Sequence, residues 1–433
     1  MTVRKSLLLL LLLLVVGAVA QAQQPPQAIR GGMSEKERAR FDGLRTSGFD
    51  ALYNLDYETA ASAFREIERL FPDHPAGPQF QAALLWSRTL NESRRMKSSL
   101  YGSDDFYEGK EDKVDEKVVN EFRDYTRRAR LLAEARLKRD PKDVEALYFL
   151  GATEGLRAAF AAGVQRSFMS ALRDGQRSVD RHRDVVKLEP SFIDAELTIG
   201  LYEYVVGSLP LPVKLVASLT GARGSRKRGL ETLARVAEQG RWARDDARAL
   251  LIVLYKREKR YADALKLARE LGEKYQRNYL FRLEAADALS SQAALERAAG
   301  KEAEADNLER EAFTIFDQLL REKPQRGSAL SSAQDQIHFQ YGETLMAAGQ
   351  FDRAAKEFMA AATTSGAEAG MATQAYLRAG QNFDLAGRRN DALAQYRVVV
   401  SRPDVYDSQE EAKRGLREPY KLKQVARTLS KQE

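Results

Sequence analysis

The sequence predicts an all-α, right-handed superhelical solenoid built from repeated helix–turn–helix units. Three observations indicate this fold class: glycine, alanine and an aromatic residue recur at fixed intervals, helical apolar spacing links them, and prolines follow the second helices. The 433 residues are 44% hydrophobic and 30% charged, which is typical of a helical protein in water. An unrelated all-α bundle is the alternative, but such a bundle does not explain why these residues recur at fixed intervals.

The chain begins with a pattern typical of a secretory signal peptide. Two basic residues in MTVRKS precede an apolar run, and small-x-small sites follow, ending at Ala20 and Ala22. We expect residues 1–22 to be removed and the mature protein to lie in the periplasm or cell envelope; an uncleaved membrane anchor is the alternative. Residues 23–38 are rich in Gln and Pro and are predicted to form a disordered linker.

The composition excludes several classes of function. The chain has no cysteine, so disulfides, thiolate catalysis and zinc–thiolate sites are excluded. We expect no metal site and no cofactor, because the three histidines are far apart and show no ligand spacing. His74 is predicted to be a surface turn residue, His182 to lie on a charged helical face, and His338 to lie near the start of a first helix. The net charge of +7 falls to +5 without residues 1–22, which does not indicate nucleic-acid binding.

The stretch SGFDALYNLDYETAASAFREIERLFPDHP shows the repeated unit most clearly. Gly48 lies twelve residues before Ala60, and Phe64 lies four after it. The small residues allow two helices to cross closely, the aromatic residue fills the space between helices, and Pro72 ends the second helix. Asp56 stands in the turn, where it is expected to cap the second helix.

The same intervals recur along the chain. Two further complete triplets are Gly342, Ala354, Phe358 and Gly380, Ala392, Tyr396. Two units match the pattern in part: one has Tyr255 and Ala264, and the other has Ala312, Phe316 and Pro324. In two others a proline is followed by a helix that contains a glycine: Pro141 with Gly151, and Pro190 with Gly200. This spacing resembles that of the tetratricopeptide repeat (TPR) superfamily.

A narrower resemblance covers residues 209–290. LPLPVKLVASLTGARGSRKRGLETL, followed by the repeat at Tyr255, is similar to exported bacterial TPR proteins of uncharacterised role and, more distantly, to the eukaryotic tetratricopeptide repeat protein 39 family. This resemblance implies no reaction. We therefore divide the chain into N-terminal repeats over 39–204, an apolar and basic insertion over 205–228, C-terminal repeats over 229–417 and a basic tail over 418–433.

The insertion carries the main basic run. GARGSRKRG lacks the order of a Walker A phosphate loop, but a basic loop before a helix can hold an anion or contact a membrane surface. The residues assigned to this role are Arg223, Arg226, Lys227 and Arg228.

The resemblance to TPR proteins implies a function in binding. Stacked helix pairs present an extended concave surface lined by the first helix of each pair, and repeat proteins bind partners there. The inward positions that we assign to binding are Arg45, Phe49, Phe339, Glu343, Met346, Leu377, Gln381 and Asp384. The mixture of apolar, amide and carboxylate groups suits a protein or peptide partner.

Two alternatives to a scaffold or adaptor stay open. A membrane-surface protein would contact the bilayer through 205–228, although Pro210 and Pro212 argue against a regular amphipathic helix there. An enzyme would need a nucleophile or general base with a partner, and no spacing in the sequence indicates one. The identity of the partner and the oligomeric state do not follow from the sequence.

Overall fold

The computed structural model describes residues 32–96, 114–208, 224–322, 329–405 and 407–422. Every regular element within these ranges is a helix, so the predicted all-α class is confirmed. The chain divides into two compact units, Met1–Ala288 and Leu289–Glu433, which we call the N-terminal and C-terminal units. The division falls inside a helix, well after the 205–228 segment at which the sequence places an interruption of the repeats.

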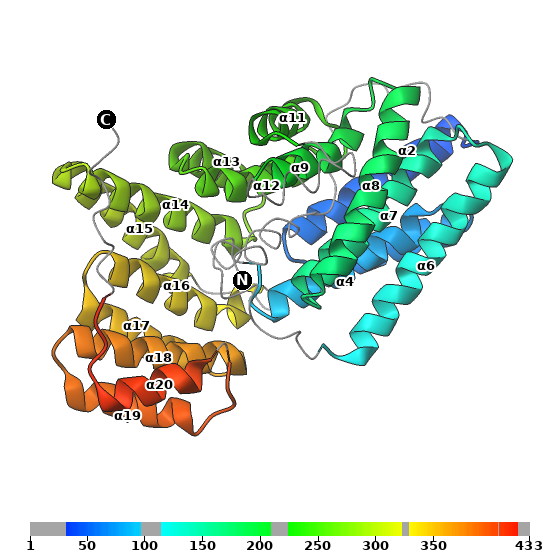
Figure 1. The fold of residues 1–433 in the computed structure, drawn as a ribbon. Coiled ribbons are helices and arrows are strands. Elements are labelled where there is room, and N and C mark those ends of the chain that lie inside the picture. Colours follow the sequence, from blue (N-terminus) through cyan, green and yellow to red (C-terminus); the bar gives the residue numbers. More distant parts are fainter. Residues whose placement is uncertain (1–31, 97–113, 209–223, 323–328, 406, 423–433) are drawn as a thin grey trace. The chain divides into compact units, whose positions relative to one another are not determined.

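The N-terminal unit is a succession of helix pairs in which each helix packs against the next (Figure 1). Its helices are α2 (Glu35–Tyr53), α3 (Tyr57–Leu70), α4 (Ala76–Glu92), α6 (Glu116–Arg139), α7 (Val144–Gly163), α8 (Phe168–Leu188), the 3-10 turn η3 (Ile193–Ala195), α9 (Glu196–Gly207), α11 (Arg226–Gln239), α12 (Arg244–Arg257) and α13 (Tyr261–Lys274). Part of the predicted 205–228 insertion is therefore helical, because α9 extends to Gly207 and α11 begins at Arg226. Residues 209–223 lie outside the described ranges.

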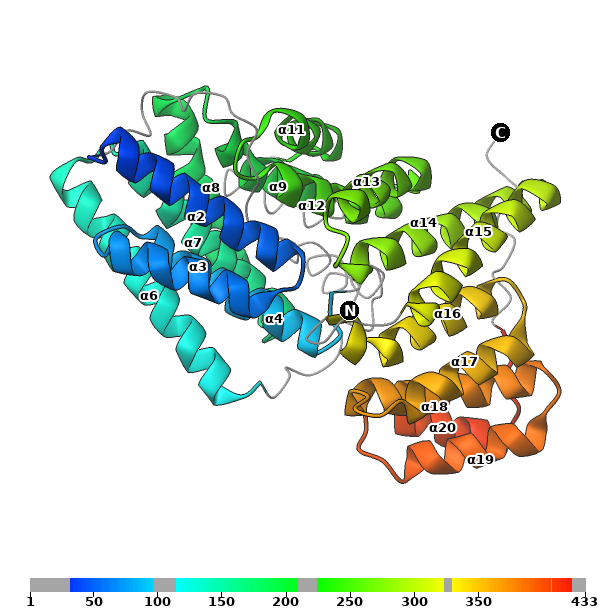
Figure 2. The same cartoon turned by 180° about the vertical axis from the view of Figure 1, so that it is seen from behind.

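The C-terminal unit continues the same pairing, and α16 to α20 stack side by side in both views (Figure 2). Helix α14 (Tyr279–Ala298) carries the boundary between the units, and the elements after it are α15 (Glu302–Arg321), η4 (Ala329–Ser332), α16 (Gln334–Ala347), α17 (Phe351–Thr363), α18 (Ala369–Leu385), α19 (Arg389–Val400) and α20 (Ser408–Arg417). The last helix, α20, packs against both α18 and α19 and closes the end of the repeats.

Side-chain caps set the beginnings of several helices. Ser34 and Glu37 form a reciprocal capping box, so α2 begins at Glu35 and the predicted linker over 23–38 extends too far. Asp56 caps α3 as expected, because its carboxylate accepts a hydrogen bond from the main-chain N–H of Thr59. The predicted signal peptide over 1–22 and the remainder of the predicted linker lie outside the described residues.

The recurring glycine and aromatic residues contact each other inside each pair. A Cβ placed on Gly48 would lie 2.3 Å from the ring of Phe64, and one on Gly342 would lie 2.9 Å from the ring of Phe358. The aromatic residue of the second helix therefore packs directly onto the glycine of the first helix. This contact explains the fixed interval, because any larger side chain at the glycine would displace the ring.

We expect leucine at Gly48 to lower the free energy of unfolding by roughly 1–3 kcal/mol, because overpacking displaces the ring of Phe64. Gly43→Leu on the same helix is the control, since a Cβ there meets nothing within 4 Å. Urea unfolding followed by tryptophan fluorescence measures both variants, because the two tryptophans, Trp86 and Trp242, lie in the N-terminal unit. Equal destabilisation by both variants would contradict the repeat assignment.

The first helix of the N-terminal unit also contacts the segment that begins α12, nearly two hundred residues later in the chain. The guanidinium of Arg45 donates to the carbonyl oxygen of Trp242 at 3.4 Å, and Asp42 pairs with Arg241 at 2.9 Å. The hydroxyl of Tyr53 donates to Asp246 on α12. We call this set, residues 42, 45 and 53 with 241, 242 and 246, the α2–α12 contact. It joins the first and fifth helix pairs directly.

Candidate functional site

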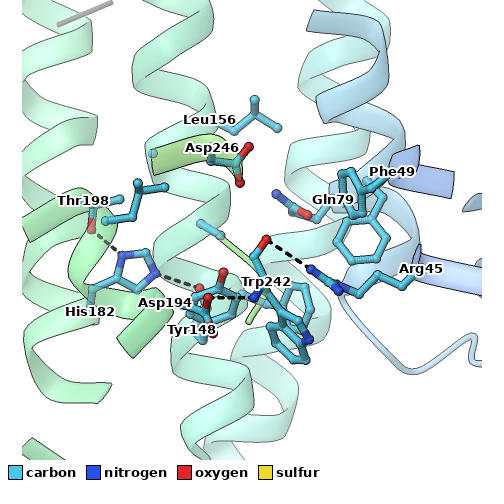
Figure 3. A pocket seen from close by; sticks show the side chains of 15 residues that line it. Arg45, Phe49, Gln79, Tyr148, Leu156, His182, Asp194, Thr198, Trp242 and Asp246 are labelled. Carbon is cyan, nitrogen blue, oxygen red and sulfur yellow. Dashed lines mark hydrogen bonds between the residues drawn. The ribbon is translucent and has the colours of Figure 1, made fainter. Parts of the chain in front are cut away.

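Helices of the N-terminal unit line a partly open cavity of about 70 Å³. Residues from α2, α4, α7, α9 and α12 line it, together with His182 of α8, Asp194 of η3 and Trp242 just before α12 (Figure 3). All five of the helices named first are the first helices of their pairs, as the TPR-like pattern predicts for an inner surface. We take this cavity as the candidate site because it gathers aromatic, cationic and acidic groups from distant parts of the chain.

Aromatic rings form much of the cavity wall. Phe49 of α2 lies 4.8 Å from Phe80 of α4, Phe80 lies 5.8 Å from Phe149 of α7, and Phe149 lies 6.0 Å from Trp242, each measured between ring centroids. These edge and tilted arrangements are favourable for aromatic pairs. The rings come from three helices of different pairs and from the segment just before α12, so the wall exists only after the pairs have stacked.

Arg45 lies at the wall of the cavity and is 2% exposed. Its guanidinium stacks 4.7 Å from a ring centroid of Trp242 and 5.5 Å from that of Phe49. Burial lowers the pKa of Arg45 to about 10, so the group stays charged at neutral pH. The sequence places both Arg45 and Phe49 on the inner face. Both line the cavity, but they are buried and do not lie on an open concave surface, because the α2–α12 contact covers them.

Two carboxyl groups also face the cavity, and each has partners in the protein. Asp194 accepts hydrogen bonds from the main-chain N–H groups of Trp242 and Ala243, both at 2.7 Å. This holds the segment that begins α12 against η3. Asp246 accepts from Tyr53, and burial raises its pKa well above the usual range, which favours the neutral form.

His182 joins three elements of the cavity wall. Its Nδ1 lies 2.5 Å from the hydroxyl of Thr198 on α9, and its Nε2 lies 3.1 Å from the carbonyl oxygen of Tyr148 on α7. Burial lowers its pKa to about 4, so the ring is neutral, with Nε2–H donating and Nδ1 accepting. The predicted position on a charged face is wrong: Gly151 leaves the space into which this ring packs.

The pKa of His182 predicts a pH dependence of stability. The unfolded histidine takes up a proton near pH 6.5 and the folded one near pH 4, so stability falls as pH decreases between these values. The contribution is about 3 kcal/mol across that window. We expect the difference in unfolding free energy between wild type and His182→Gln to shrink by this order from pH 7 to pH 4.5. A constant difference in urea titrations at both pH values would contradict the assignment.

His74 is also buried, contrary to the predicted surface turn. It is 4% exposed, and its Nε2 lies 3.3 Å from the carboxylate of Glu145. Glu145 is fully buried and also pairs with Arg38 at 2.8 Å and with Arg136 at 3.2 Å. We call these four residues the Glu145 cluster. It lies at the start of α7, where α2 and α6 converge, and it is an internal ion network. His338 lies near the start of α16 as expected and pairs with Glu357 at 2.7 Å.

The predicted binding positions in the C-terminal unit fall into two groups. Those on α16 are half-buried: Phe339, Glu343 and Met346. Those on α18 make contacts within the protein. Leu377 and Gln381 are buried, and the Gln381 amide donates to Glu411 of α20 at 2.9 Å.

Asp384 completes the α18 set and is also engaged inside the protein. Its carboxylate accepts from Arg389, from the Tyr396 hydroxyl and from the main-chain N–H of Tyr420. The α18 positions are therefore not an open binding surface, because α20 and the segment after it cover them.

The basic residues assigned to anion or membrane contact have carboxylate neighbours where they are described. Arg226 lies 3.5 Å from Glu258, Lys227 lies 3.9 Å from Glu231, and Arg228 lies 3.7 Å from Glu203. Arg223 lies outside the described residues. Paired charges of this kind attract an external anion less strongly than isolated ones.

The same described ranges bear on metal binding and on membrane insertion. They contain no group of three or more His, Asp and Glu side chains placed to hold a metal ion. None of the helices described there combines the length and the apolar character needed to cross a bilayer.

Comparisons with known proteins find remote structural similarities. No family model and no curated protein sequence matches the chain. Similar solved structures include the human IFIT1 dimer with m7Gppp-AAAA, at 12% identity over 90% of this chain and 86% of that one, with a TM-score of 0.44. Yeast Tom70 is 10% identical over 88% and 92% of the two chains, with a TM-score of 0.34.

A tetratricopeptide repeat protein from Parabacteroides merdae is 14% identical over 75% of this chain and 92% of that one, with a TM-score of 0.27. Similarities with TM-scores of 0.27 to 0.44 carry no argument about this chain. The glycine–aromatic contacts give the direct evidence, since they occur in the chain itself. The described part of the chain is thus an all-α repeat fold whose helix pairs resemble tetratricopeptide repeats in the spacing and contact of glycine and aromatic residues.

Proposed function

We propose that the protein is an exported helical-repeat scaffold that binds a protein or peptide partner and catalyses no reaction. One observation supports this most directly. On α16, Phe339, Glu343 and Met346, which the repeat pattern assigns to the inner side, lie one helical turn apart and are half-buried. The assigned positions on α2 and two of the three on α18 are buried instead. Among the assigned positions, those on α16 therefore keep partly accessible side chains of mixed chemistry.

This mixture suits a polypeptide partner. A peptide presents main-chain N–H and C=O groups that need partners, together with apolar side chains that need contact area. Glu343 supplies an acceptor, and Phe339 and Met346 supply apolar surface. A thioether adapts to irregular partner surfaces because it is flexible and polarizable.

The location of this function is part of the proposal. The basic start, apolar run and A-x-A sites of residues 1–22 support export, with cleavage after Ala20 or Ala22. N-terminal sequencing of the protein recovered from the envelope fraction tests it. A mature chain that begins at Met1 would show that the segment stays as an anchor.

The binding surface is tested by charge reversal on α16. Glu343→Lys is compared with Glu410→Lys, which makes the same charge change on the exposed face of α20, where the Glu410 side chain is 67% exposed. Each protein is crosslinked in the envelope and its partners are identified by mass spectrometry. We expect wild type and Glu410→Lys to capture the same partner and Glu343→Lys to lose it while its helicity, measured by circular dichroism, is unchanged.

Equal capture by both variants would contradict binding on α16. The membrane-surface alternative is then tested by co-sedimentation with anionic liposomes, using the full chain and a chain that lacks 209–223. It has less support than the scaffold, because the described basic residues next to that segment already lie beside carboxylates.

A further inference from the structure

We propose that the cavity of the N-terminal unit binds a small monocarboxylate, with its carboxylate on Arg45 and its short alkyl chain among the apolar residues of the wall. This is a second, separate activity, since it lies in another unit from the α16 surface. The ligand is a free short-chain acid of about the size of propionate.

The first step of the argument is the hydrogen bonding of Arg45. A guanidinium has five N–H donors, and among the described residues this one makes a single hydrogen bond, at 3.4 Å, to the carbonyl oxygen of Trp242. A buried charge without hydrogen-bonded partners is costly. The rings of Trp242 and Phe49 stabilise the cation from its faces but accept no N–H in its plane. An acceptor in the cavity would meet that need.

The second step concerns the nearby carboxyl groups of the described residues, none of which accepts a hydrogen bond from Arg45. Asp42 attracts the cation but pairs with Arg241. Asp194 is engaged by the main-chain N–H groups of Trp242 and Ala243, and no ion pair joins it to Arg45 within the described residues. Asp246 is engaged by Tyr53 and its neutral form is favoured. The cavity therefore contains a cation that neighbouring carboxylates attract but do not hydrogen-bond. Because these carboxylates are near, one added negative charge is more favourable there than two.

The third step is size and shape. A volume of about 70 Å³ gives room for roughly five water-sized groups, since each needs roughly 10–15 Å³. A peptide segment or a nucleotide does not fit such a space. Phe80, Leu156 and Leu197 line the cavity together with Arg45, so a ligand with one charged and one apolar end matches it. The planar carboxylate matches the planar guanidinium, with which it forms two parallel hydrogen bonds.

Binding is tested on the full chain by calorimetric titration with sodium propionate, and by the thermal midpoint followed through tryptophan fluorescence. The matched probes are propionamide, propylamine and inorganic phosphate. We expect saturable binding of propionate, with a fluorescence change because Trp242 stacks on Arg45, and at least tenfold weaker binding of each other probe. Binding of the amine or the phosphate as tight as that of propionate overturns the proposal, and so does the absence of saturation by propionate up to 50 mM.

Variants locate the site. Arg45→Met removes the charge at similar length, and Arg397→Met on the exposed face of α19 is the matched control for losing an arginine. Ala152→Leu fills the cavity and leaves Arg45 in place, so it stays informative if Arg45→Met fails to fold. We expect both cavity variants to lose propionate binding by at least tenfold and Arg397→Met to retain it. Retention by Ala152→Leu overturns the proposal.

One further probe separates a free acid from a protein C-terminus. A tripeptide that ends in alanine is titrated with a free and with an amidated C-terminus, and we expect neither to bind. Binding of the free form as tight as propionate overturns the assignment to a free acid. Glu343→Lys is expected to bind propionate normally, so failure of the scaffold function and failure of this proposal are distinguishable.

Discussion

Replacing Glu145 by glutamine is expected to lower the free energy of unfolding by about 3–5 kcal/mol. The carboxylate is fully buried and pairs with Arg38 and Arg136, and it faces His74 at 3.3 Å. Glutamine has nearly the same shape but no charge. The guanidinium groups of Arg38 and Arg136 therefore lose the negative charge with which they pair. The effect is large because an unpaired buried cation costs more than the ion pair itself contributes.

Tryptophan fluorescence during urea unfolding measures this effect in the N-terminal unit. The control is Glu92→Gln, since the side chain of Glu92 is 62% exposed and pairs with Arg88 at the surface. Exposed ion pairs contribute about 0–1 kcal/mol, so this control should unfold nearly as wild type does. A Glu145→Gln variant as stable as the control would show that the cluster is not the buried ion network described.

The same cluster predicts sensitivity to acid. Although burial alone would raise the pKa of Glu145, His74 and Arg38 hold it well below its usual range. A carboxyl group with a lowered pKa contributes stability above its unfolded pKa, near 4.3, and this contribution is lost as pH falls further. Wild type should therefore lose more stability than Glu145→Gln below that pH.

The repeats could be predicted because their signal is local. Gly48 and Phe64 contact each other within one helix pair, so the interval between them is fixed by one turn and two short helical segments. The α2–α12 contact could not be predicted. It joins residues 197 apart in sequence, such as Arg45 and Trp242, and its formation depends on the summed rotations of every intervening pair. Small differences in each rotation accumulate, and the spacing of glycines does not encode them.

The candidate site was accordingly predicted only in part. Arg45 and Phe49 were assigned to the inner side by their repeat positions, but their burial depends on the α2–α12 contact. His182 and Asp246 were missed because each stands in a charged stretch, DRHRD and RDDARAL, that reads as a solvent-exposed helix face. One feature of the sequence could have identified His182. Gly151 is the glycine of a first helix, but the second helix of that pair has no aromatic residue at the matching position. The ring of His182 packs onto this glycine instead.

Replacing Trp242 by alanine is expected to cost about 3–5 kcal/mol in the N-terminal unit, since it removes a buried aromatic side chain and leaves a cavity. The ring contacts three others, Tyr148, Phe149 and Phe192, at centroid distances of 5.5–6.0 Å. It also supports the guanidinium of Arg45 across the α2–α12 contact. Both the wall of the cavity and the joining of the first and fifth pairs therefore depend on this residue.

Trp242→Phe separates these contributions. The indole Nε1 has no hydrogen-bond partner in the described residues, so phenylalanine loses ring area but no hydrogen bond. We expect it to retain more stability than alanine. Trp86 is then the single tryptophan in each variant and reports unfolding of the same unit. Leu131→Ala, at a residue 48% exposed on α6, should change stability by less than about 0.5 kcal/mol.

Hydrogen exchange of α2 identifies where the Trp242→Ala variant opens. If the α2–α12 contact holds the first pair in place, amides of α2 should exchange faster in Trp242→Ala, whereas those of α17 and α18 in the C-terminal unit should not change. Destabilisation without faster exchange in α2 would mean that Trp242 serves only the packing around α7 and η3. In that case α2 would be held by its own pair, through Gly48 and Phe64, and would still line the cavity without the ring that stacks on Arg45.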